Sequence, residues 1–174
     1  MLASRIETPL QRLTSLSQEL DIELWVKRDD LTAIPGGGSK IRKLVRIIEQ
    51  MPEDTDAVVT TGAVQSNHAR VVALTAAARG LHCELILHGD PEDLKSPTGN
   101  LLLMLLSGAK VSIVPSDLIG ATITSAMERL RAEGRKPTLI QGGGHSVEGA
   151  LGLADAILEL DAQRPSRDWI PDYI

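Results

Sequence analysis

The chain has 174 residues, of which 43% are hydrophobic and 24% are charged, and its net charge is -5. This length suits one domain, or one domain with a piece of another, and the composition is that of a folded globular protein rather than a disordered one. The mild negative charge gives no reason to expect nucleic acid or an anionic membrane as a partner. Aromatic residues make up only 2%, which argues against platforms for base stacking.

No targeting segment or membrane span is expected, because no run of the sequence is apolar for long enough. We therefore expect a cytoplasmic location. The single cysteine, Cys83, excludes an internal disulfide and a cysteine-based zinc site. It lies in an apolar run, which favours a buried and unreactive thiol. No cluster of metal ligands stands out, so no metal is expected.

The first elements that the pattern predicts are a strand and a helix. Residues 22–27 alternate in polarity and predict a strand, a loop follows over 28–38, and residues 39–50 predict a helix. This helix carries an apolar stripe made of Ile41, Leu44, Val45, Ile47 and Ile48.

From Ala57 onward, short apolar strands alternate with helices. The strands are expected over 57–61, 82–87, 110–114 and 137–141, and the helices over about 66–79, 97–106, 119–133 and 147–160. Strands that are apolar on both faces suit a parallel sheet with helices on both sides. The repeated strand-helix units therefore predict an α/β fold with an open parallel sheet and flanking helices.

The end of the sequence predicts the beginning of one more strand. A polar, proline-marked loop over 164–169 precedes the segment 170–174, whose pattern is typical of a strand start. Because such a strand has nothing to complete it here, we expect a truncated, cleaved or split protein.

A glycine-rich loop precedes the helix predicted from residue 39. Gly36 to Gly38 allow a sharp turn and the close approach of another group, and Ser39 is a suitable helix cap. Lys40 then lies in the first helical turn, where the partial positive charge of the helix start favours a neutral amine. Schiff-base chemistry needs such an amine. The alternative is a flexible loop with a solvated lysine.

A second segment of interest, residues 60–68, joins a strand to a helix. It is expected at the carboxyl end of the parallel sheet, where open α/β folds bind ligands. The backbone N–H groups of a helix start can hold a carboxylate, while Ser66 offers a hydroxyl and Asn67 an amide. The alternative is that Ser66 or Asn67 only caps the helix.

Several short motifs occur in one order along the chain. They are Thr8-Pro9-Leu10, Lys27-Arg28-Asp29-Asp30, Gly37 to Leu44, Gly62 to His68, Gly99-Asn100, and Gly142 to His145 before Gly149 to Gly152. Their order and spacing resemble those of the D-cysteine desulfhydrase and aminocyclopropane-carboxylate deaminase family. That family belongs to the tryptophan-synthase-β-like, fold type II class of pyridoxal-phosphate enzymes, and the resemblance covers essentially the whole chain.

The resemblance implies how the chain is organised. Residues 51–146 would form the complete small α/β domain, 1–50 the N-terminal part of the large cofactor domain, and 147–174 a return helix and the truncated start of the large domain. It also implies pyridoxal 5'-phosphate as cofactor and a small amino acid as substrate.

The resemblance assigns roles to individual residues. Lys40 matches the lysine that binds the cofactor covalently, and Asn67 matches the asparagine that donates a hydrogen bond to its phenolic oxygen. Ser66 matches the catalytic serine that faces the substrate and acts as nucleophile or proton relay in the deaminases. Gln65 and the segment from Ser66 to His68 would bind the substrate, whose carboxylate the backbone receives.

Two departures from the deaminase pattern bear on the reaction. His68 stands where deaminases usually carry glutamine, and the loop 88–93 lacks their tryptophan. Both favour β-elimination from D-cysteine or a near analogue, giving pyruvate, ammonia and sulfide. The alternatives are aminocyclopropane-carboxylate deamination and a non-catalytic, truncated α/β module. His145 replaces a common serine, and it either contacts the substrate or only fills its loop.

The resemblance also indicates what lies outside this chain. The glycine-rich loop that holds the cofactor phosphate would follow a strand that starts near Tyr173, so we expect the chain by itself to be inactive. We expect a homo-oligomer, or a second chain that carries the C-terminal half. The apolar faces of two helices would otherwise lack cover. These faces are Ile41, Leu44, Val45 and Ile48 on one helix and Leu151, Leu153, Ala154 and Ile157 on the other.

Overall fold

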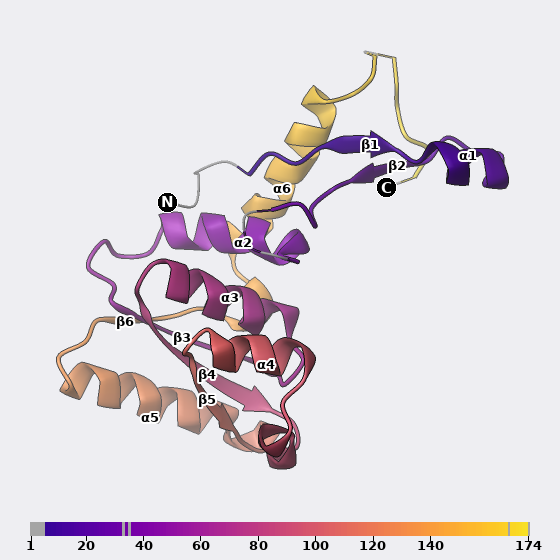
Figure 1. Cartoon of the computed structure of the whole chain (residues 1–174). Coiled ribbons are helices and arrows are strands. Elements are labelled where there is room, and N and C mark those ends of the chain that lie inside the picture. The colour runs from indigo at the N-terminus through magenta and orange to yellow at the C-terminus, as the bar shows by residue number, and fades with distance from the viewer. Residues whose placement is uncertain (1–5, 33, 35, 167, 174) are drawn as a thin grey trace.

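A computed structural model describes residues 6–32, 34, 36–166 and 168–173 (Figure 1). In chain order the elements are β1 (Leu10–Arg12), α1 (Thr14–Leu20), β2 (Trp25–Lys27), α2 (Gly38–Glu49), β3 (Ala57–Ala63), α3 (Asn67–Ala78), β4 (His82–His88), α4 (Gly99–Leu106), β5 (Lys110–Ile113), α5 (Ile119–Ala132), β6 (Pro137–Leu139) and α6 (Val147–Ala162). Short 3-10 turns η1 (Pro91–Lys95), η2 (Ser116–Leu118) and η3 (Gly142–Gly144) lie in the connections. None of the helices in this part of the chain is long and apolar enough to cross a membrane.

Strands β3 to β6 form one parallel sheet, in the order β5-β4-β3-β6. Ala57 pairs with His82 on β4 and with Pro137 on β6, and Glu84 pairs with Lys110 on β5. The predicted α/β fold with a parallel sheet is thus confirmed. The chain moves outward from β3 through β4 to β5, and β6 then returns to the other side of β3. Open α/β sheets bind ligands at the carboxyl ends of the strands where the order reverses in this way.

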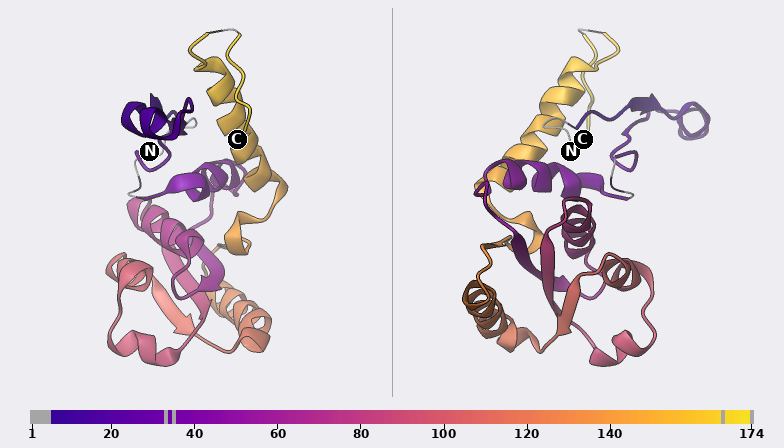
Figure 2. Two further views of the ribbon diagram at one scale, coloured as in Figure 1. Left: turned by 90° about the vertical axis from the view of Figure 1, so that its right-hand side faces the viewer. Right: turned by 60° about the vertical axis from the view of Figure 1, so that its left-hand side comes forward.

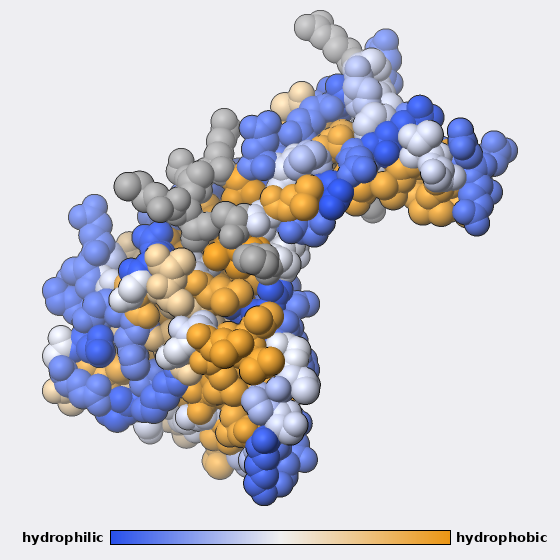
Figure 3. Space-filling model, in the orientation of Figure 1, coloured by the Kyte–Doolittle hydropathy of each residue, from blue (hydrophilic) through white to orange (hydrophobic). Residues whose placement is uncertain are grey.

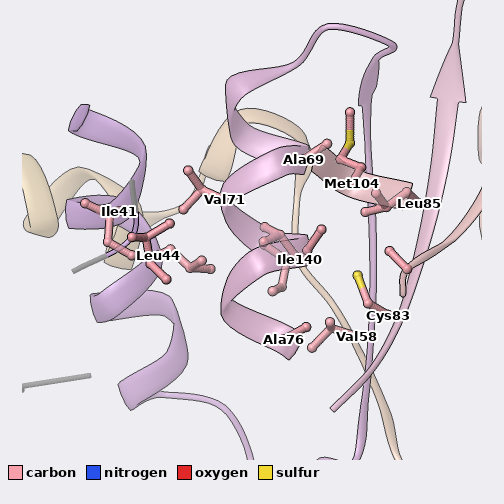
Figure 4. Close-up of a cluster of buried hydrophobic side chains, with 14 of the residues drawn as sticks. Ile41, Leu44, Val58, Ala69, Val71, Ala76, Cys83, Leu85, Met104 and Ile140 are labelled. Atoms are coloured by element: carbon pink, nitrogen blue, oxygen red, sulfur yellow. The ribbon is translucent and has the colours of Figure 1, made fainter. Parts of the chain in front are cut away.

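Helices cover both faces of this sheet (Figure 1). Because successive side chains of a strand point to opposite faces, Val58 and Leu85 join the core under α3 and α4, whereas Val59 and Ile86 pack against α5. Figure 4 shows the larger of the two cores, between α2, α3, α4 and the sheet. We call β3 to β6 with α3, α4 and α5 (residues 57–144) the body.

Helix α2 lies across α3, and its apolar face is buried there (Figure 4). Ile41 is 0% exposed, Leu44 is 1% exposed, and both join the core with Val71 and Ile140. The expectation that this face would lack cover is therefore wrong, because α3 supplies it. The sequence pattern identified the stripe but not the helix against which it packs.

Elements β1, α1, β2 and α6 project from the body (Figure 2). We call them, residues 10–27 and 147–162, the arm. Strands β1 and β2 are antiparallel, with Leu10 opposite Lys27. Neither β1 nor α1 was expected from the sequence. The strand expected near the C-terminus is also wrong for the described residues 168–173, which pair with no strand. Instead the ring of Trp169 packs edge-on against Trp25, with 5.9 Å between ring centroids.

A buried arginine on α2 joins the arm to the body. Arg42 is 2% exposed along its side chain and donates two hydrogen bonds of 2.7 Å to the carboxylate of Asp29. It donates further bonds to Glu159 on α6 (2.8 Å) and to the hydroxyl of Thr8 (2.9 Å), and Lys27 also contacts Glu159 and the Thr8 carbonyl. Thr8, Lys27 and Asp29 belong to the first two sequence motifs, and all three therefore have a structural role.

Helices α2 and α6 approach each other closely at a glycine. A Cβ added at Gly152 would collide with the carbonyl oxygen of Arg42. A side chain at this position would therefore push α6 away from α2 and break the ion pairs between them.

Candidate functional site

Three separate segments meet beside the carboxyl ends of β3 and β6. They are the start of α2 with Lys40, the turn from β3 into α3, and the glycine turn η3, which packs against α2, α3 and β3. Lys43, one turn after Lys40, donates to the carbonyl of Gly143 over 3.3 Å. This is the point where the strand order reverses, so the expected segments do come together where a ligand would bind.

His68, in the first turn of α3, is only 3% exposed. Its Nε2 atom is 3.0 Å from the hydroxyl of Thr60, and that hydroxyl donates to the carbonyl of Ile140 over 2.7 Å. Because a hydroxyl has a single proton, Thr60 can only accept from Nε2. The Nε2 atom therefore carries a proton, and Nδ1 of the neutral ring is an acceptor. A buried ring of this kind favours a role for the His68 backbone, rather than its side chain, at the substrate.

Burial lowers the pKa of His68 to about 4, and the positive charges of Lys40, Lys43 and His145 act in the same direction. The imidazole is therefore neutral at neutral pH. These three side chains influence His68 because α2 and the glycine turn η3 both contact α3. Thr60 and Lys43 were not expected here, since a hydroxyl inside a strand and a lysine on a helix carry no functional signal by themselves.

Ser66 is the N-cap of α3. Its Oγ atom accepts from the amide of Ala69 over 3.1 Å, so Ser66 does cap the helix. A Cβ at Gly62 would lie 2.6 Å from Ser66 Oγ, so glycine suits this position near the end of β3. The cap uses an acceptor lone pair of the hydroxyl and leaves its proton to donate. Capping is thus compatible with the predicted catalytic role of Ser66, which stays a prediction.

The side-chain amide of Asn67 is held at its oxygen end. Asn67 Oδ1 accepts from Nδ2 of Asn100 over 3.0 Å and from Nη2 of Arg70 over 3.5 Å. Its Nδ2 group is the end that remains to donate. Gln65, in contrast, uses both ends of its amide against the start of α4, through Thr98 and the amide of Asn100. Its predicted contact with substrate stays untested.

A hydrogen bond from Arg70 of α3 holds the glycine loop before Lys40. Gly36 has φ of +63°, a region that favours glycine, and its carbonyl accepts from Nη2 of Arg70 over 2.5 Å. Lys40 is partly buried in the first turn of α2, as expected. The helix begins at Gly38 with Gly37 as its N-cap, so the expectation that Ser39 caps it is wrong.

His145 is exposed at the end of the glycine turn. A Cβ at Gly143 would lie 3.0 Å from its ring, so the ring covers that glycine. Whether it also contacts a substrate stays open. No group of three His, Cys, Asp or Glu side chains with the arrangement of a metal site occurs among the described residues.

The donor set fits pyridoxal phosphate, the cofactor that the resemblance implies. Lys40 offers a primary amine for an aldehyde carbon, and the free end of Asn67 is a donor that matches a phenolic oxygen. The first turn of α3 offers backbone N–H groups for a carboxylate, since a helix start leaves such groups without intrahelical partners. Lys40 lies on α2 and the other groups lie on α3, and the larger core joins these two helices.

Comparison with known proteins agrees with this fit. The family described as "Pyridoxal-phosphate dependent enzyme" matches residues 2–172. A protein of Pyrococcus abyssi (strain GE5 / Orsay) named "Putative 1-aminocyclopropane-1-carboxylate deaminase" is 44% identical over 161 residues, which are 90% of this chain and 48% of that protein. The D-cysteine desulfhydrase of Salmonella newport (strain SL254) is 37% identical over 161 residues, again 90% of this chain and 49% of the relative.

Solved structures give the same result. A structure described as an ACC deaminase homologue has a TM-score of 0.80 and 38% identity, and covers 95% of this chain and 51% of that one. A threonine deaminase from T.th., with a TM-score of 0.72 and 22% identity over 94% of this chain and 48% of that one, shares the fold. The chain thus spans about half the length of the relatives that it matches.

Proposed function

The chain belongs to the pyridoxal-phosphate dependent enzyme family, and we propose that it supplies the cofactor lysine and the substrate loop of a lyase active site. The proposed reaction is β-elimination from a small amino acid such as D-cysteine, which consumes water and gives pyruvate, ammonia and sulfide. Pyridoxal phosphate, when bound, supplies the electron sink for this chemistry. The protein's own groups bind, orient and move protons.

Each group has a defined task in this proposal. The Nζ atom of Lys40 would hold the cofactor, and the same amine would serve as the base that takes the proton from the substrate's α-carbon. Nδ2 of Asn67 donates to the phenolic oxygen of the cofactor. The first-turn amides of α3 receive the substrate carboxylate, and the hydroxyl proton of Ser66 is directed at the substrate. Neutral His68 stabilises the β3–α3 turn through its hydrogen bond to the hydroxyl of Thr60.

The observation that carries the proposal is the convergence of α2, the β3–α3 turn and η3 at one point of the sheet. These segments are separated by tens of residues in the sequence, yet η3 packs against α2, α3 and β3, and Lys43 of α2 donates to the carbonyl of Gly143. A single loop with a solvated lysine would not require this arrangement. The convergence supports a site built around an amine.

Trapping the lysine tests the proposal. The chain, with and without a second chain equivalent to the C-terminal half of the Pyrococcus abyssi relative, is incubated with pyridoxal phosphate and reduced with borohydride. The cofactor should become attached at Lys40, and Lys40→Ala should abolish this adduct. Lys43→Ala is the matched control, one turn along the same helix, and should keep it.

An adduct that persists in Lys40→Ala and maps to Lys27 or Lys43 would show that the lysine is wrongly assigned. A wild-type chain that takes up no cofactor in either form would instead favour the non-catalytic α/β module.

A side-by-side assay separates the two candidate reactions. We expect faster sulfide release from D-cysteine than ring opening of 1-aminocyclopropane-1-carboxylate, on the basis of His68 and the tryptophan-free loop 88–93. The 44% identical Pyrococcus relative, whose name refers to the deaminase, favours the second candidate. Equal or reversed rates would assign the chain to the deaminase group.

We also propose that a second chain, or another copy of this chain, completes the site. In this proposal residues 51–146 form the small domain, and 1–50 with 147–174 belong to the large domain. Large apolar side chains of α6 are exposed: Val147, Leu151, Leu153, Ile157 and Leu158. Figure 3 shows a further hydrophobic area over α4, where Leu102, Leu103 and Leu106 are exposed. Such contiguous apolar surface is typical of interaction sites.

Sedimentation velocity tests this part of the proposal. The purified chain should self-associate, or should form a defined complex when the complementary half is added. A monodisperse monomer that neither binds the complementary half nor binds a dye for apolar surface would contradict it.

A further inference from the structure

Asn100 lies in the first turn of α4, but its polar groups bind the turn that carries Asn67. Its Nδ2 donates to the carbonyl of Gln65 over 2.7 Å and to Oδ1 of Asn67 over 3.0 Å. Its backbone amide donates to Oε1 of Gln65 over 2.9 Å. Asn100 thus links the start of α4 to the β3–α3 turn by three hydrogen bonds.

These contacts decide which end of the Asn67 amide faces outward. A primary amide has an acceptor end and a donor end of nearly equal size, so shape alone does not choose between them. At Asn67, two neighbouring hydrogen-bond donors determine the orientation of the amide. Nδ2 of Asn100 holds Oδ1, and Nη2 of Arg70 lies 3.5 Å from the same oxygen. With the oxygen occupied by these donors, the Nδ2 group is the end of the amide that is left to donate elsewhere.

We propose that Asn100 is a positioning residue that fixes the amide of Asn67 with its donor end toward the cofactor. The contact with the cofactor rests on the proposed function above, whereas the orientation itself does not. If the amide were rotated by half a turn, its oxygen would face the phenolic oxygen, and two acceptors would oppose each other. Asn100 would then control cofactor binding without contacting the cofactor.

The substitution Asn100→Asp tests the orientation directly. Aspartate keeps the size of the side chain and the backbone amide bond to Gln65, but it replaces the donor by an acceptor. The Asn67 amide should then rotate, so that its Nδ2 donates to the new carboxylate. Acidic residues are favourable in the first turn of a helix, so this variant should remain folded.

Nuclear magnetic resonance of the nitrogen-labelled chain, without cofactor, gives the first readout. In the wild type, the Asn100 side-chain protons should exchange slowly and those of Asn67 quickly. In Asn100→Asp the Asn67 protons should become about tenfold slower to exchange, as one charged hydrogen bond requires. Asn100→Ala should leave them fast. Leu102→Asp, which adds the same charge in the same turn, is the control and should also leave them fast.

Pyridoxal phosphate titration, followed by its visible absorbance, gives the second readout. Asn100→Asp should weaken binding about tenfold and Asn100→Ala by less, because alanine permits rotation without enforcing it. Neither should have an additional effect in an Asn67→Ala background, since the positioning acts through Asn67.

The outcomes separate the two proposals. Unchanged Asn67 protons in Asn100→Asp would overturn the positioning role, whatever the cofactor does. An additive effect of Asn100→Asp in the Asn67→Ala background would also overturn it. Cofactor binding that is unaffected by Asn67→Ala would instead count against the proposed function of Asn67, while the proton exchange still decides the orientation.

Discussion

The body and the arm are held together by different forces. In the body, the side chains of β4 that face the helices are fully enclosed, with Leu85 and Leu87 both 0% exposed. The arm has only partly buried strands, and it is attached through Arg42 to Asp29 and Glu159. Apolar burial depends little on pH or salt, whereas attachment by charges depends on both.

This difference matters for the candidate site. The turn before α3 and the glycine turn η3 belong to the body, whereas Lys40 lies on α2, which contacts both the body and the arm. Loosening the arm should therefore disturb the position of the lysine more than that of Ser66 or Asn67. The predictions below test the comparison, beginning with the largest expected effect.

Leu85→Ala should destabilise the whole protein. Leu85 lies on the central strand β4 in the larger core, and its replacement leaves a cavity that costs about 4 kcal/mol of unfolding free energy. Urea unfolding followed by circular dichroism measures this. Leu158→Ala on the arm, where the side chain is 68% exposed, is the control and should cost about 0.5 kcal/mol or less. Equal effects would contradict the division into body and arm.

Arg42→Met should detach the arm and leave the body folded. Methionine keeps most of the side-chain volume, but Asp29 and Glu159 lose the cation that they share, at a cost of about 3 kcal/mol. Hydrogen exchange should become faster in β1, β2 and α6 and stay slow in β3 and β4. The control is Arg46→Met, because the partly exposed pair of Arg46 with Asp155 is worth about 1 kcal/mol or less. Uniform acceleration across the chain would show that the arm is not an independent unit.

As the pH falls, the body should lose stability at a higher pH than the arm. Burial, with nearby cations, lowers the pKa of His68 to about 4 from a usual 6.5, so the unfolded chain binds this proton more readily. The stability that neutral His68 provides is complete above about pH 6.5 and is lost as the pH falls toward 4, by up to about 3 kcal/mol. His68→Gln should remove this component, measured by urea unfolding at several pH values.

The arm should respond in a lower pH range. Burial alone would raise the pKa of Asp29 and Glu159, but hydrogen bonds from Arg42 outweigh it and hold both pKa values below their usual range. Their contribution is present above about pH 4, where unfolded carboxyls are ionised, and is lost as the pH falls further. If hydrogen exchange in β1 and α6 accelerated already near pH 6, this order would be wrong.

The same contrast explains how much of the fold the sequence could predict. The body repeats one pattern, and strands β3 to β6 were placed within about two residues because each is a short apolar segment that alternates with a helix. In the arm the outcome is mixed, because β2 and α6 were expected over 22–27 and 147–160 but β1 and α1 were not. Strand β1 has three residues with a mostly exposed pattern, so the sequence carried no signal for it. The strand expected near Ile170 failed because a strand requires a neighbour, which a local pattern does not reveal.

The candidate site divides in a similar way. Lys40, Ser66 and Asn67 could be named because each lies in a motif at the start of a helix, and these motifs occur in a recognisable order. The roles of Asn100, Arg70 and Thr60 could not be named. Their importance comes from hydrogen bonds to residues that are distant in sequence, and side-chain contacts of this kind have no period. Ser39 was misjudged as a cap because three consecutive glycines allow the helix to begin at more than one position.

The smallest expected effect compares two serines that cap helices, one in the body and one at the start of the arm's long helix. Ser66 accepts from Ala69 and Ser146 accepts from Gly149, each over 3.1 Å. Replacing either by alanine should cost about 1 kcal/mol of unfolding free energy, because each removes one such bond. Only Ser66→Ala should also reduce turnover in the completed enzyme. Ser66→Asn separates the two roles, since asparagine caps a helix as well as serine but has no hydroxyl proton. It should restore stability without restoring turnover, and an Asn variant that is both stable and active would show that Ser66 serves only as a cap.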